Sequence, residues 1–356
     1  MRHYSTPMPP RAGGAMTRLA AARLRHLGHD PVPVLRKAGL SLEESDNPEA
    51  RLDVGCQIAL LGLAAEMLKD DVLGFHLAEA ADLREAGLLY FVLASSTTFR
   101  EALERAERYS TIANEAITLR CLRGREVGID LDYVGVPRHA DRHQIEFVAT
   151  VLVRMARQTT GTALRPIRVA FVHPRCTASQ HIEAFFACPI AFGSACDVIA
   201  FAPEASEFPL TGADPYLNNL LVGYCEEALA HRSRPVQALR TRVENATTPL
   251  LPHGKARAGE VARKVGLSQR TLARRLAAEG LTFARILNEL RADLAQHYLQ
   301  DSSLSVSEVA WLLGFQEVSA FTHACKRWTG RTPSQVRSQE TRDLYQRELH
   351  RSSMTR

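Results

Sequence analysis

Two arginines, Arg270 and Arg274, stand four residues apart in the segment 269–276, which reads QRTLARRL. In a helix this spacing places both side chains on one face, together with Ala273 and Ala277. An arginine on the outer face of a helix can donate two hydrogen bonds to the edge of a guanine in the DNA major groove. The same four residues would also suit an ordinary solvated helix face, so the surrounding sequence has to decide between these two interpretations.

The segment 260–280 predicts the elements that would position these arginines. Gly266 ends a first short helix, Ser268 caps a second one, and Gly280 ends the second. Two short helices joined by a turn of about three or four residues, with a basic outer face on the second, are typical of a DNA-binding helix-turn-helix. The apolar residues expected on the inner faces of the two helices are Val261, Ala262, Val265, Leu272 and Leu276.

The same pattern recurs in residues 305–330. Ser305 caps a short helix, Glu308 follows three residues later as in a capping box, and Gly314 marks the turn. Residues 283–299 predict a long amphipathic helix that can act as a rigid spacer between the two copies. Two units held in this way can enter successive major grooves, about 34 Å apart on one face of the DNA. The residues expected on the outer face of the second copy are Val318, Ser319, Thr322 and His323.

The positive charge of the chain is concentrated in the part that contains both copies. Residues 236–342 hold 16 Lys and Arg against 9 Asp and Glu, whereas residues 1–235 hold 25 against 28. A basic last third joined to a mildly acidic remainder indicates that one end of the protein meets a polyanion. The repeated units and this charge together favour DNA binding over a plain solvated surface.

Length and composition place the chain among globular proteins. Its 356 residues correspond to about two domains, and 46% hydrophobic with 23% charged residues excludes a disordered or fibrous protein. The longest uncharged stretch, residues 86–99, has 14 residues and is too short to cross a bilayer. Residues 1–16 lack the apolar core of a signal peptide. We therefore expect a cytoplasmic protein that does not enter a membrane, with its seven cysteines as reduced thiols.

The first two thirds of the chain predict an α+β domain with a mixed sheet and helices packed on it, and the remainder predicts an all-α domain. Residues 116–122 and 127–134 alternate in polarity around a charged turn, which indicates a β-hairpin. Residues 190–192 and 198–201 indicate a second, shorter hairpin, and residues 167–172 a buried strand. Helices are expected over residues 16–27, 52–68, 98–110, 141–158, 179–186 and 215–231.

Residues 236–340 resemble the DNA-binding domain of the AraC/XylS family of bacterial transcription regulators. The resemblance rests on VARKVGLSQRTLARRL at 261–276, on the Gly-Phe pair at 314–315, and on AFTHACKRWTGRTPSQVR at 320–337. Upstream segments resemble the effector-sensing domain of the subgroup that contains the ornithine-utilisation regulator. They are GLLYFVLASSTTFREALERAERY at 87–109, FFACPIAFGSACDVIAFAPE at 185–204 and PLTGADPYL at 209–217.

The resemblance implies which residues read DNA, and two positions depart from the family pattern. His323 stands where most relatives have Arg, so a permanent charge becomes one that titrates near neutral pH. Cys325 stands where most have Phe, and the smaller core side chain leaves space worth on the order of 2–4 kcal/mol unless neighbours fill it. We expect a looser or repacked second unit, with the first unit carrying more of the sequence reading. The implied base-reading residues are Arg270, Thr271, Ala273, Arg274, Val318, Ser319, Thr322 and His323, and the candidate phosphate contacts are Lys264, Arg275, Lys326 and Arg327.

The function implied by the resemblance is a non-enzymatic regulator that binds double-stranded promoter DNA and responds to a small molecule. The implied effector is an amino acid, a fatty acid or an aromatic carboxylate. We expect an activator in preference to a repressor, no cofactor, a homodimer, and RNA polymerase as a further partner. The domains expected are a flexible arm at 1–17, an effector-sensing and dimerisation domain at 18–235, a double helix-turn-helix domain at 236–340 and a flexible tail at 341–356.

Other residue groups have competing interpretations. His139 and His143 have the spacing of metal ligands, but no third ligand accompanies them, so a solvated helix end is favoured and no metal site is expected. Cys176, Cys188 and Cys196 are expected to be buried thiols; the alternative function is a cysteine-based redox sensor or enzyme with an attached DNA-binding domain. An adaptor that no longer binds DNA is a third hypothesis. The aromatic residues expected in the core, or else in contact with an effector, are Phe185, Phe186, Phe192, Phe201 and Tyr216.

Overall fold

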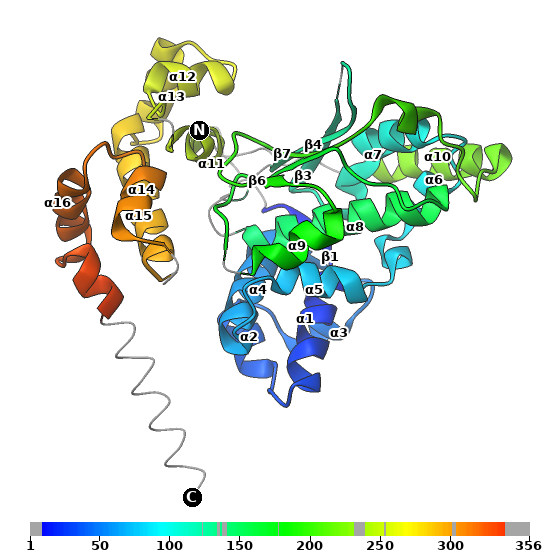
Figure 1. The fold of residues 1–356 in the computed structure, drawn as a ribbon, viewed down its shortest axis with the longest axis horizontal. Helices are drawn as coiled ribbons and strands as arrows, with labels where there is room; N and C mark the ends of the chain where they lie inside the picture. Colours follow the sequence, from blue (N-terminus) through cyan, green and yellow to red (C-terminus); the bar gives the residue numbers. More distant parts are fainter. Residues whose placement is uncertain are drawn as a thin grey trace, which may run out of the picture. The chain divides into compact units, whose positions relative to one another are not determined.

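A computed structural model of the protein describes residues 9–122, 124–133, 136, 141–176, 178–230, 239–252, 254–300 and 304–338. The chain divides into two compact units, Met1–Thr241 and Arg242–Arg356. In Figure 1 the colours run from blue to green along the first unit and from yellow to red along the second. The expected domain boundary near 233–235 and the expected tail at 341–356 lie outside the described residues.

The N-terminal unit contains a mixed sheet of five described strands. β3 pairs antiparallel with β4, β4 with β7, and β7 with β5, whereas β5 and β6 are parallel. The mixed sheet with helices against it confirms the α+β class predicted for this part of the chain. In order across the sheet the strands are β3 (Ile117–Cys121), β4 (Val127–Tyr133), β7 (Asp197–Phe201), β5 (Arg168–Ala170) and β6 (Ile190–Ala191).

The first predicted hairpin is confirmed and the second is wrong. β3 and β4 pair with Leu119 opposite Leu131. β7 does not pair with β6; it lies between β4 and β5, and β6 pairs with β5 so that Ile190 is opposite Val169. All five residues of β7 are buried, so this strand packs on both faces and takes a central place, whereas the short β6 lies at the edge.

Every helix predicted in this unit is present, with ends displaced by a few residues. The Thr98 hydroxyl caps α7 by accepting a hydrogen bond from the Glu101 amide at 3.3 Å. Four short helices, α2, α3, α5 and α6, lack a predicted counterpart because five to eight residues show too little periodicity. The helices are α1 (Ala15–His26), α2 (Val32–Lys37), α3 (Leu42–Asp46), α4 (Val54–Leu68), α5 (Leu73–Ala80), α6 (Leu88–Ala94), α7 (Phe99–Ala113), α8 (Arg142–Thr160), α9 (Ser179–Phe186) and α10 (Pro215–Ala230), with short 3₁₀ turns at η1 (Leu83–Ala86) and η3 (Pro203–Glu207).

The structure differs from the flexible arm expected over residues 1–17. β1 (Arg11–Gly13) pairs antiparallel with β2 (Arg51–Asp53), and Ala12 lies opposite Leu52. Ala12 and Leu52 are both buried, as is Met16 in the first turn of α1. These apolar residues are too few and too scattered to show a period, so their burial depends on partners from other parts of the chain. Residues 1–8 lie outside the described ranges.

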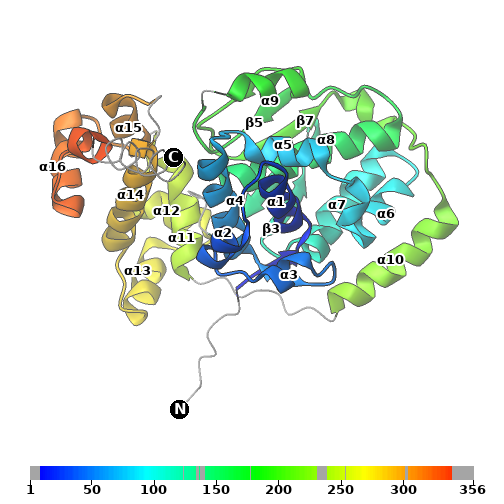
Figure 2. The same cartoon turned by 90° about the horizontal axis from the view of Figure 1, so that it is seen from below.

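Two apolar clusters hold the N-terminal unit together. The larger one joins the sheet to α7 and α8 and includes the fully buried side chains of Tyr109, Tyr133 and Phe171. The smaller one joins α1, α2 and α4 through residues such as Leu24 and Leu60. Figure 2 shows α6, α7 and α10 grouped at one end of this unit.

The C-terminal unit contains only helices, turns and loops over its described residues, as predicted. The cluster that joins α14 to the second helix pair includes Leu290, Leu313 and Phe321. α14 has 18 residues and is therefore about 27 Å long; in Figures 1 and 2 the first helix pair lies at one end of it and the second pair lies alongside it. The helices are α11 (Leu239–Thr247), α12 (Ala258–Lys264), α13 (Gln269–Ala278), α14 (Phe283–Gln300), α15 (Val306–Leu312) and α16 (Val318–Thr329), with a 3₁₀ turn at η4 (Thr248–Leu250) and further helix at 333–338. Among the helices of the described residues in either unit, none combines the length and apolarity needed to span a bilayer.

Candidate nucleic-acid interface

A tight turn joins α12 to α13 and sets the direction of α13. Gly266 has a φ of +72°, and the Leu267 amide donates a hydrogen bond to the Ala262 carbonyl at 2.8 Å, which ends α12 in a Schellman-type turn. The Ser268 hydroxyl accepts a hydrogen bond from the Thr271 amide at 3.2 Å and so caps α13, as predicted.

The turn between α15 and α16 repeats this geometry. Gly314 has a φ of +75°, and the Phe315 amide donates to the Ala310 carbonyl at 2.9 Å. Ser305 and Glu308 form the predicted capping box at the start of α15. The same local chemistry therefore sets the angle between the two helices in each pair, and both pairs are helix-turn-helix units.

An arginine from outside each helix pair holds its turn in place. Arg242 of α11 donates from Nη2 to the Val265 carbonyl at 2.6 Å. Arg291 of α14 donates from Nε to the Leu313 carbonyl at 2.9 Å, and its guanidinium lies 4.7 Å from the centre of the Phe315 ring. Burial lowers the pKa of Arg291, but an arginine remains charged at physiological pH. Neither arginine is recognisable from the sequence, because no local pattern marks a partner more than 20 residues away.

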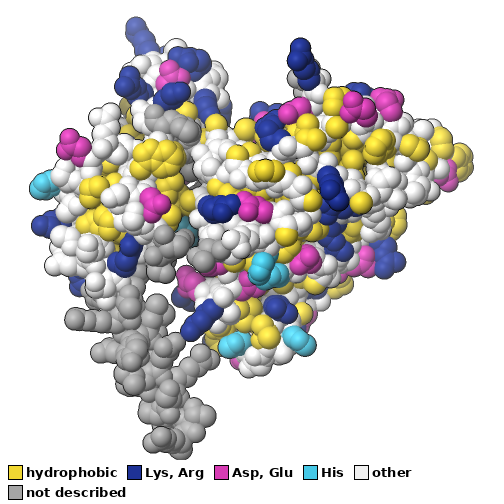
Figure 3. Space-filling model, in the orientation of Figure 1, with side chains coloured by type: hydrophobic (Ala, Val, Ile, Leu, Met, Phe, Trp, Pro, Cys, Tyr) yellow, Lys and Arg dark blue, Asp and Glu magenta, His cyan; other side chains and the backbone are white. Residues whose placement is uncertain are grey.

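α13 presents a cationic strip to solvent. Leu272 and Leu276 bury the opposite face of the helix, each at 1% exposure or less. Neither Arg270 nor Arg274 forms an ion pair with any residue that the structure describes. In Figure 3 the Lys and Arg side chains gather over α12 and α13. The exposed residues of the strip are the predicted ones, Arg270, Ala273, Arg274 and Ala277.

Thr271, another predicted base-reading residue, is partly engaged in the helix cap. Its side chain is half-buried, and its Oγ1 lies 2.8 Å from the Ser268 Oγ. One of the hydrogen-bonding positions of this hydroxyl is therefore occupied by the cap, and the two neighbouring arginines remain the strongest donors on the strip.

The corresponding strip on α16 carries no permanent charge. Val318 is 39% exposed, and His323 is exposed. The Ser319 hydroxyl donates to the Glu317 carboxylate at 3.1 Å, and the Thr322 hydroxyl donates to the Val318 carbonyl at 2.9 Å. Two of the four predicted reading residues on α16 thus already use their donors within the protein.

The four candidate phosphate contacts are all exposed. Lys264, Arg275 and Lys326 have no ion-pair partner among the described residues. Arg327 donates to the Asn288 side-chain oxygen at 3.4 Å, and the Trp328 indole N–H donates to the same oxygen at 3.1 Å. Arg327 is accordingly tied to α14, whereas the other three side chains are available to an external anion.

Cys325 occupies a core position, as the resemblance implied. It is fully buried in the cluster of the second unit, and burial raises the pKa of its thiol. The aromatic rings around this region are in contact, since the centre of Phe315 lies 5.7 Å from that of Phe321 and 6.2 Å from that of Trp328. These contacts show that the core of the second unit is built around its aromatic residues.

The expected solvated helix end is wrong for His143, and His139 lies outside the described residues. His143 is only 7% exposed because α5 packs against the start of α8, with Gly74 in backbone contact with His143. Its Nδ1 lies 3.8 Å from Oε2 of Glu146, which is also buried. Among the described residues, no group of three or more His, Cys, Asp or Glu could hold a metal ion.

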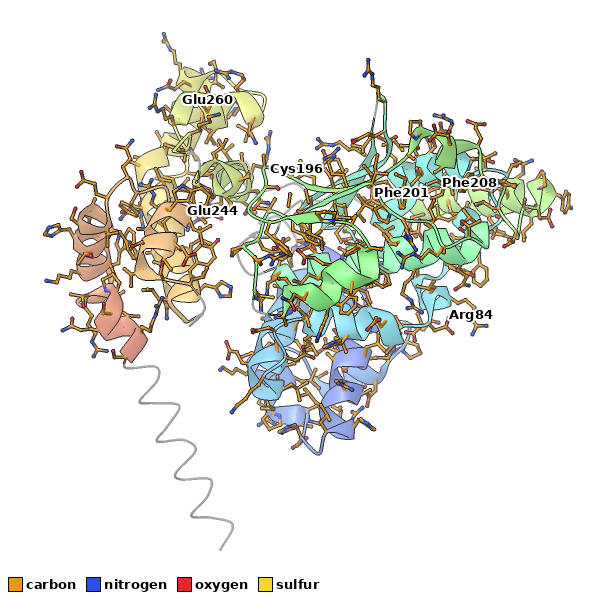
Figure 4. All side chains as sticks on the ribbon, in the orientation of Figure 1. Arg84, Cys196, Phe201, Phe208, Glu244 and Glu260 are labelled. Carbon is orange, nitrogen blue, oxygen red and sulfur yellow. The ribbon has the colours of Figure 1, made fainter. Side chains whose placement is uncertain are left out.

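The three cysteines considered for redox chemistry differ in environment. Cys176 is buried and Cys188 is half-buried, and burial raises the pKa of both thiols. A raised pKa lowers the share of reactive thiolate, so these two sites do not favour the redox alternative. Cys196 is exposed (Figure 4), which corrects the expectation that it is buried, because it lies in the loop that leads into β7.

The aromatic residues considered for effector contact are mostly part of the core. Phe186 and Phe201 are buried, and the Phe201 ring (Figure 4) lies 5.3 Å from that of Phe99. Tyr216 is 76% exposed on α10. None of the five lines a cavity of about 360 Å³ that lies elsewhere in the N-terminal unit. A stripe at helical spacing on α8 lines this cavity and is visible in the sequence, although it was not among the predicted effector contacts: Gln144, Val148, Val151 and Met155.

Two helix-turn-helix units on one linking helix, with an exposed unpaired cationic strip, define the chain as a DNA-binding transcription regulator. Residues 28–210 match the family described as the arabinose-binding domain of AraC transcription regulator, and residues 261–339 match a helix-turn-helix domain family. The first match alone covers more than half of the 356 residues. The chain therefore belongs to the AraC family of transcription regulators, with an N-terminal effector-binding domain, and this family is not one of enzymes.

Named relatives match most of the length of the chain. The chain is 27% identical over 321 residues to the HTH-type transcriptional regulator VirS of Mycobacterium tuberculosis, covering 88% of this chain and 93% of that protein. It is 27% identical over 300 residues to the ornithine utilization regulator of Pseudomonas aeruginosa, covering 83% and 87%. The crystal structure of the regulator CdpR from the same organism aligns with a TM-score of 0.42 and 23% identity over 86% of this chain and 97% of that one. The sequence matches confirm the predicted family and its predicted kinship with the ornithine-utilisation regulator.

Proposed function

We propose that this regulator reads the sequence of its promoter mainly through α13. The observation that carries the proposal is the strip on which Arg270 and Arg274 are exposed, adjacent in space on one helix face, and without ion pairs among the described residues. Each guanidinium can donate a bidentate pair of hydrogen bonds to guanine. Ala273 lies between them and is small enough to let the helix approach the base edges, and Thr271 supplies one further hydroxyl.

α16 has a weaker reading role in this proposal. Val318 can contact a thymine methyl, while Ser319 and Thr322 offer hydroxyl oxygens as acceptors. His323 supplies positive charge only when it is protonated. The second unit therefore adds affinity and spacing, and α13 adds most of the discrimination between bases.

The N-terminal unit supplies the effector response and the homodimer contact in this proposal. An effector changes DNA binding only if it binds one conformation of the regulator better than another. Two shorter matches, a 38% identical one over 78 residues and a 30% identical one over 102 residues, belong to proteins named as transcriptional activators. These names support an activator over a repressor; RNA polymerase as a partner and a cytoplasmic location are further parts of the proposal.

Selection from a random duplex pool at about 150 mM salt, followed by footprinting of the enriched duplexes, tests the reading role. We expect a motif spanning about two helical turns, with the stronger base preferences in one half. Enrichment of no motif would contradict sequence-specific binding and would support the adaptor hypothesis. Equal preferences in both halves would contradict the dominant role of α13.

Replacing Arg274 by alanine should cost about 1–3 kcal/mol of binding free energy on the selected site and relax the preference at one base pair, because a bidentate base contact is lost. The measurement is a titration of the variant against the selected duplex and against single-base variants of it. Arg275→Ala on the same helix is the matched control, and it should weaken binding to all these duplexes alike. Uniform loss for Arg274→Ala would show that Arg274 contacts phosphate.

Replacing Lys326 by alanine should weaken binding to every duplex by a similar factor, because a phosphate contact carries no base information. The slope of log affinity against log salt should become shallower by about one unit, since one fewer counterion is released. Lys37→Ala, on α2 of the N-terminal unit, is the control and should leave the slope unchanged. A wild-type slope for Lys326→Ala would remove this side chain from the interface.

A further inference from the structure

The N-terminal unit contains a cavity of about 360 Å³ between α1, α6, α7, α8 and β3. This volume lies within the range of small-molecule sites and would hold roughly a dozen water molecules. Most of its wall is apolar, with side chains such as Leu89, Ile117, Val148 and Leu152. A cavity of this size is well above the voids that ordinary core packing leaves.

The apolar wall contains a small number of polar atoms without protein partners. Gln144 is fully buried, and neither its Nε2 nor its Oε1 has a hydrogen-bond partner among the described residues. The Ser110 hydroxyl and the Nη1 of Arg18 are likewise buried and unpartnered within the described part of the chain. All three residues line the cavity. Buried polar atoms are costly unless something satisfies them, so this wall is built to meet a polar group from outside the chain.

The charged side chains of the wall are already neutralised by the protein. Arg18 Nη2 bonds the Glu85 carboxylate at 2.8 Å. Arg51 donates to the Ile112 carbonyl at 2.9 Å and to the Glu115 carboxylate at 3.1 Å. Asp82, the remaining charged residue of the wall, accepts a hydrogen bond from Arg84 at 2.7 Å. Both arginines of the wall have an acidic partner, so an anionic ligand would gain no unpaired positive charge. A cationic ligand would have to separate Glu85 from Arg18, or Asp82 from Arg84. Burying an unpaired charge is expensive, so the wall favours an uncharged ligand.

Gln144 indicates the chemistry of the ligand's polar group. Its amide offers one acceptor and one donor side by side, both unused. A carboxamide or lactam presents the complementary donor and acceptor and can form two parallel hydrogen bonds with it. Val148, Val151 and Met155 follow Gln144 along the same face of α8 and line the cavity. Because these side chains are apolar, the rest of the ligand must be apolar as well.

We propose that this cavity is the effector site, and that it takes an uncharged amphipathic molecule with an amide-type polar group held by Gln144 and an apolar body along α8. This inference rests on the proposed function for its regulatory meaning, because the ligand acts as an effector only if the chain is a regulator. The proposed effector class is uncharged amides, in place of the carboxylates and free amino acids that the family resemblance implied.

The test uses the full chain without DNA and measures binding by calorimetry with three probes: octanamide, octanoate and L-ornithine. Octanamide should bind, octanoate should bind at least tenfold more weakly although it has nearly the same shape, and ornithine should not bind. No binding of octanamide would overturn the proposal, and tighter binding of octanoate would overturn the uncharged class. Because no DNA is present, failure here leaves the promoter-reading proposal intact, and failure of the duplex selection leaves the calorimetric result intact.

Gln144→Leu tests the recognition role directly. Leucine removes the amide at similar size, so octanamide binding should weaken at least tenfold, while the unliganded melting temperature stays the same or rises because a buried unpartnered amide is lost. Thr150→Val on the same helix is the matched control, since Thr150 is also fully buried with an unpartnered hydroxyl but does not line the cavity. It should leave octanamide binding unchanged. Equal weakening in both variants, or none in Gln144→Leu, would overturn the role of Gln144.

Discussion

Gly314→Ala should destabilise the C-terminal unit by roughly 2–5 kcal/mol and weaken DNA binding by the chain, because the second helix-turn-helix unit is distorted. The glycine has a φ of +75°, which costs an L side chain about 1–2 kcal/mol. A Cβ at this position would also lie 2.5 Å from the Leu251 carbonyl oxygen and 3.2 Å from its carbon. Backbone atoms of a packed segment cannot move away as a flexible side chain can, so the turn between α15 and α16 would have to open.

Gly330→Ala is the matched control for this prediction. Gly330 has the same φ of +75°, but a Cβ there would meet no atom within 4 Å. It should cost only the conformational part, about 1–2 kcal/mol. Both tryptophans of the chain, Trp311 and Trp328, lie in the C-terminal unit, so their fluorescence during urea unfolding reports this unit selectively. If the two variants lost similar free energies of unfolding, the close contact between a Cβ at position 314 and the Leu251 carbonyl would make no contribution.

The second large effect concerns Glu146, and we expect its replacement by glutamine to remove a pH dependence of the N-terminal unit. Burial raises the pKa of Glu146 to about 8, against an ordinary value of 4.5. Its oxygens lie 3.6 Å from Nε2 of His173 and 3.8 Å from Nδ1 of His143, beyond hydrogen-bond distance. The charged group Arg142 favours ionisation, while Asp70 and Asp71 oppose it.

The sign of the effect follows from which state holds the proton. Between about pH 5 and 8 the folded unit keeps the Glu146 proton that the unfolded chain has released, so the free energy of unfolding falls as the pH rises through this window. The loss should be on the order of 3 kcal/mol for a group so fully buried. Glu146→Gln stays neutral at every pH and should therefore be more stable than the wild type at pH 8, with little difference at pH 5.

Circular dichroism of urea unfolding at pH 5.5, 7 and 8.5 measures this effect. Glu226→Gln is a useful control, because hydrogen bonds from Arg108 and Tyr109 lower the pKa of Glu226 to about 2. Its stabilising pairing is complete throughout this window and is lost only as the pH falls toward 2, so the control should shift stability by the same amount at all three pH values. A wild-type slope that persists in Glu146→Gln would show that another group titrates.

Most of the DNA-binding half can be predicted from the sequence, because its determinants are local. Ser268 and Ser305 cap helices that begin within one residue of them, and the turn glycines act on their own φ angles. The exposed strip on α13 follows from residue spacing alone, since positions three and four residues apart share a helix face. The family resemblance names three residues of this strip, Arg270, Ala273 and Arg274, and adds the half-buried Thr271.

Other features depend on residues that are distant in the chain. For these features the sequence predictions were either wrong or absent. β6 and β7 are both recognisable as strands, but only the packed sheet decides that β7 takes the centre between β4 and β5. The hydrogen bonds by which Arg242 and Arg291 hold the two turns join residues more than 20 positions apart. β1 is a strand because it pairs with β2, which lies far from it along the chain.

The sequence by itself determined the two helix-turn-helix units, the charge that directs them to DNA, and the family, because capping, turns and helix periodicity act over a few residues. The tertiary structure alone decided where the effector cavity lies and which polar atoms it leaves unpartnered. Gln144 reads in the sequence as one polar residue near a helix start. Its ligand-binding role becomes recognisable only in the folded chain, where α1, α6 and α7 pack around α8 and bury its amide without a partner. Burial and hydrogen-bond satisfaction are properties of the folded chain.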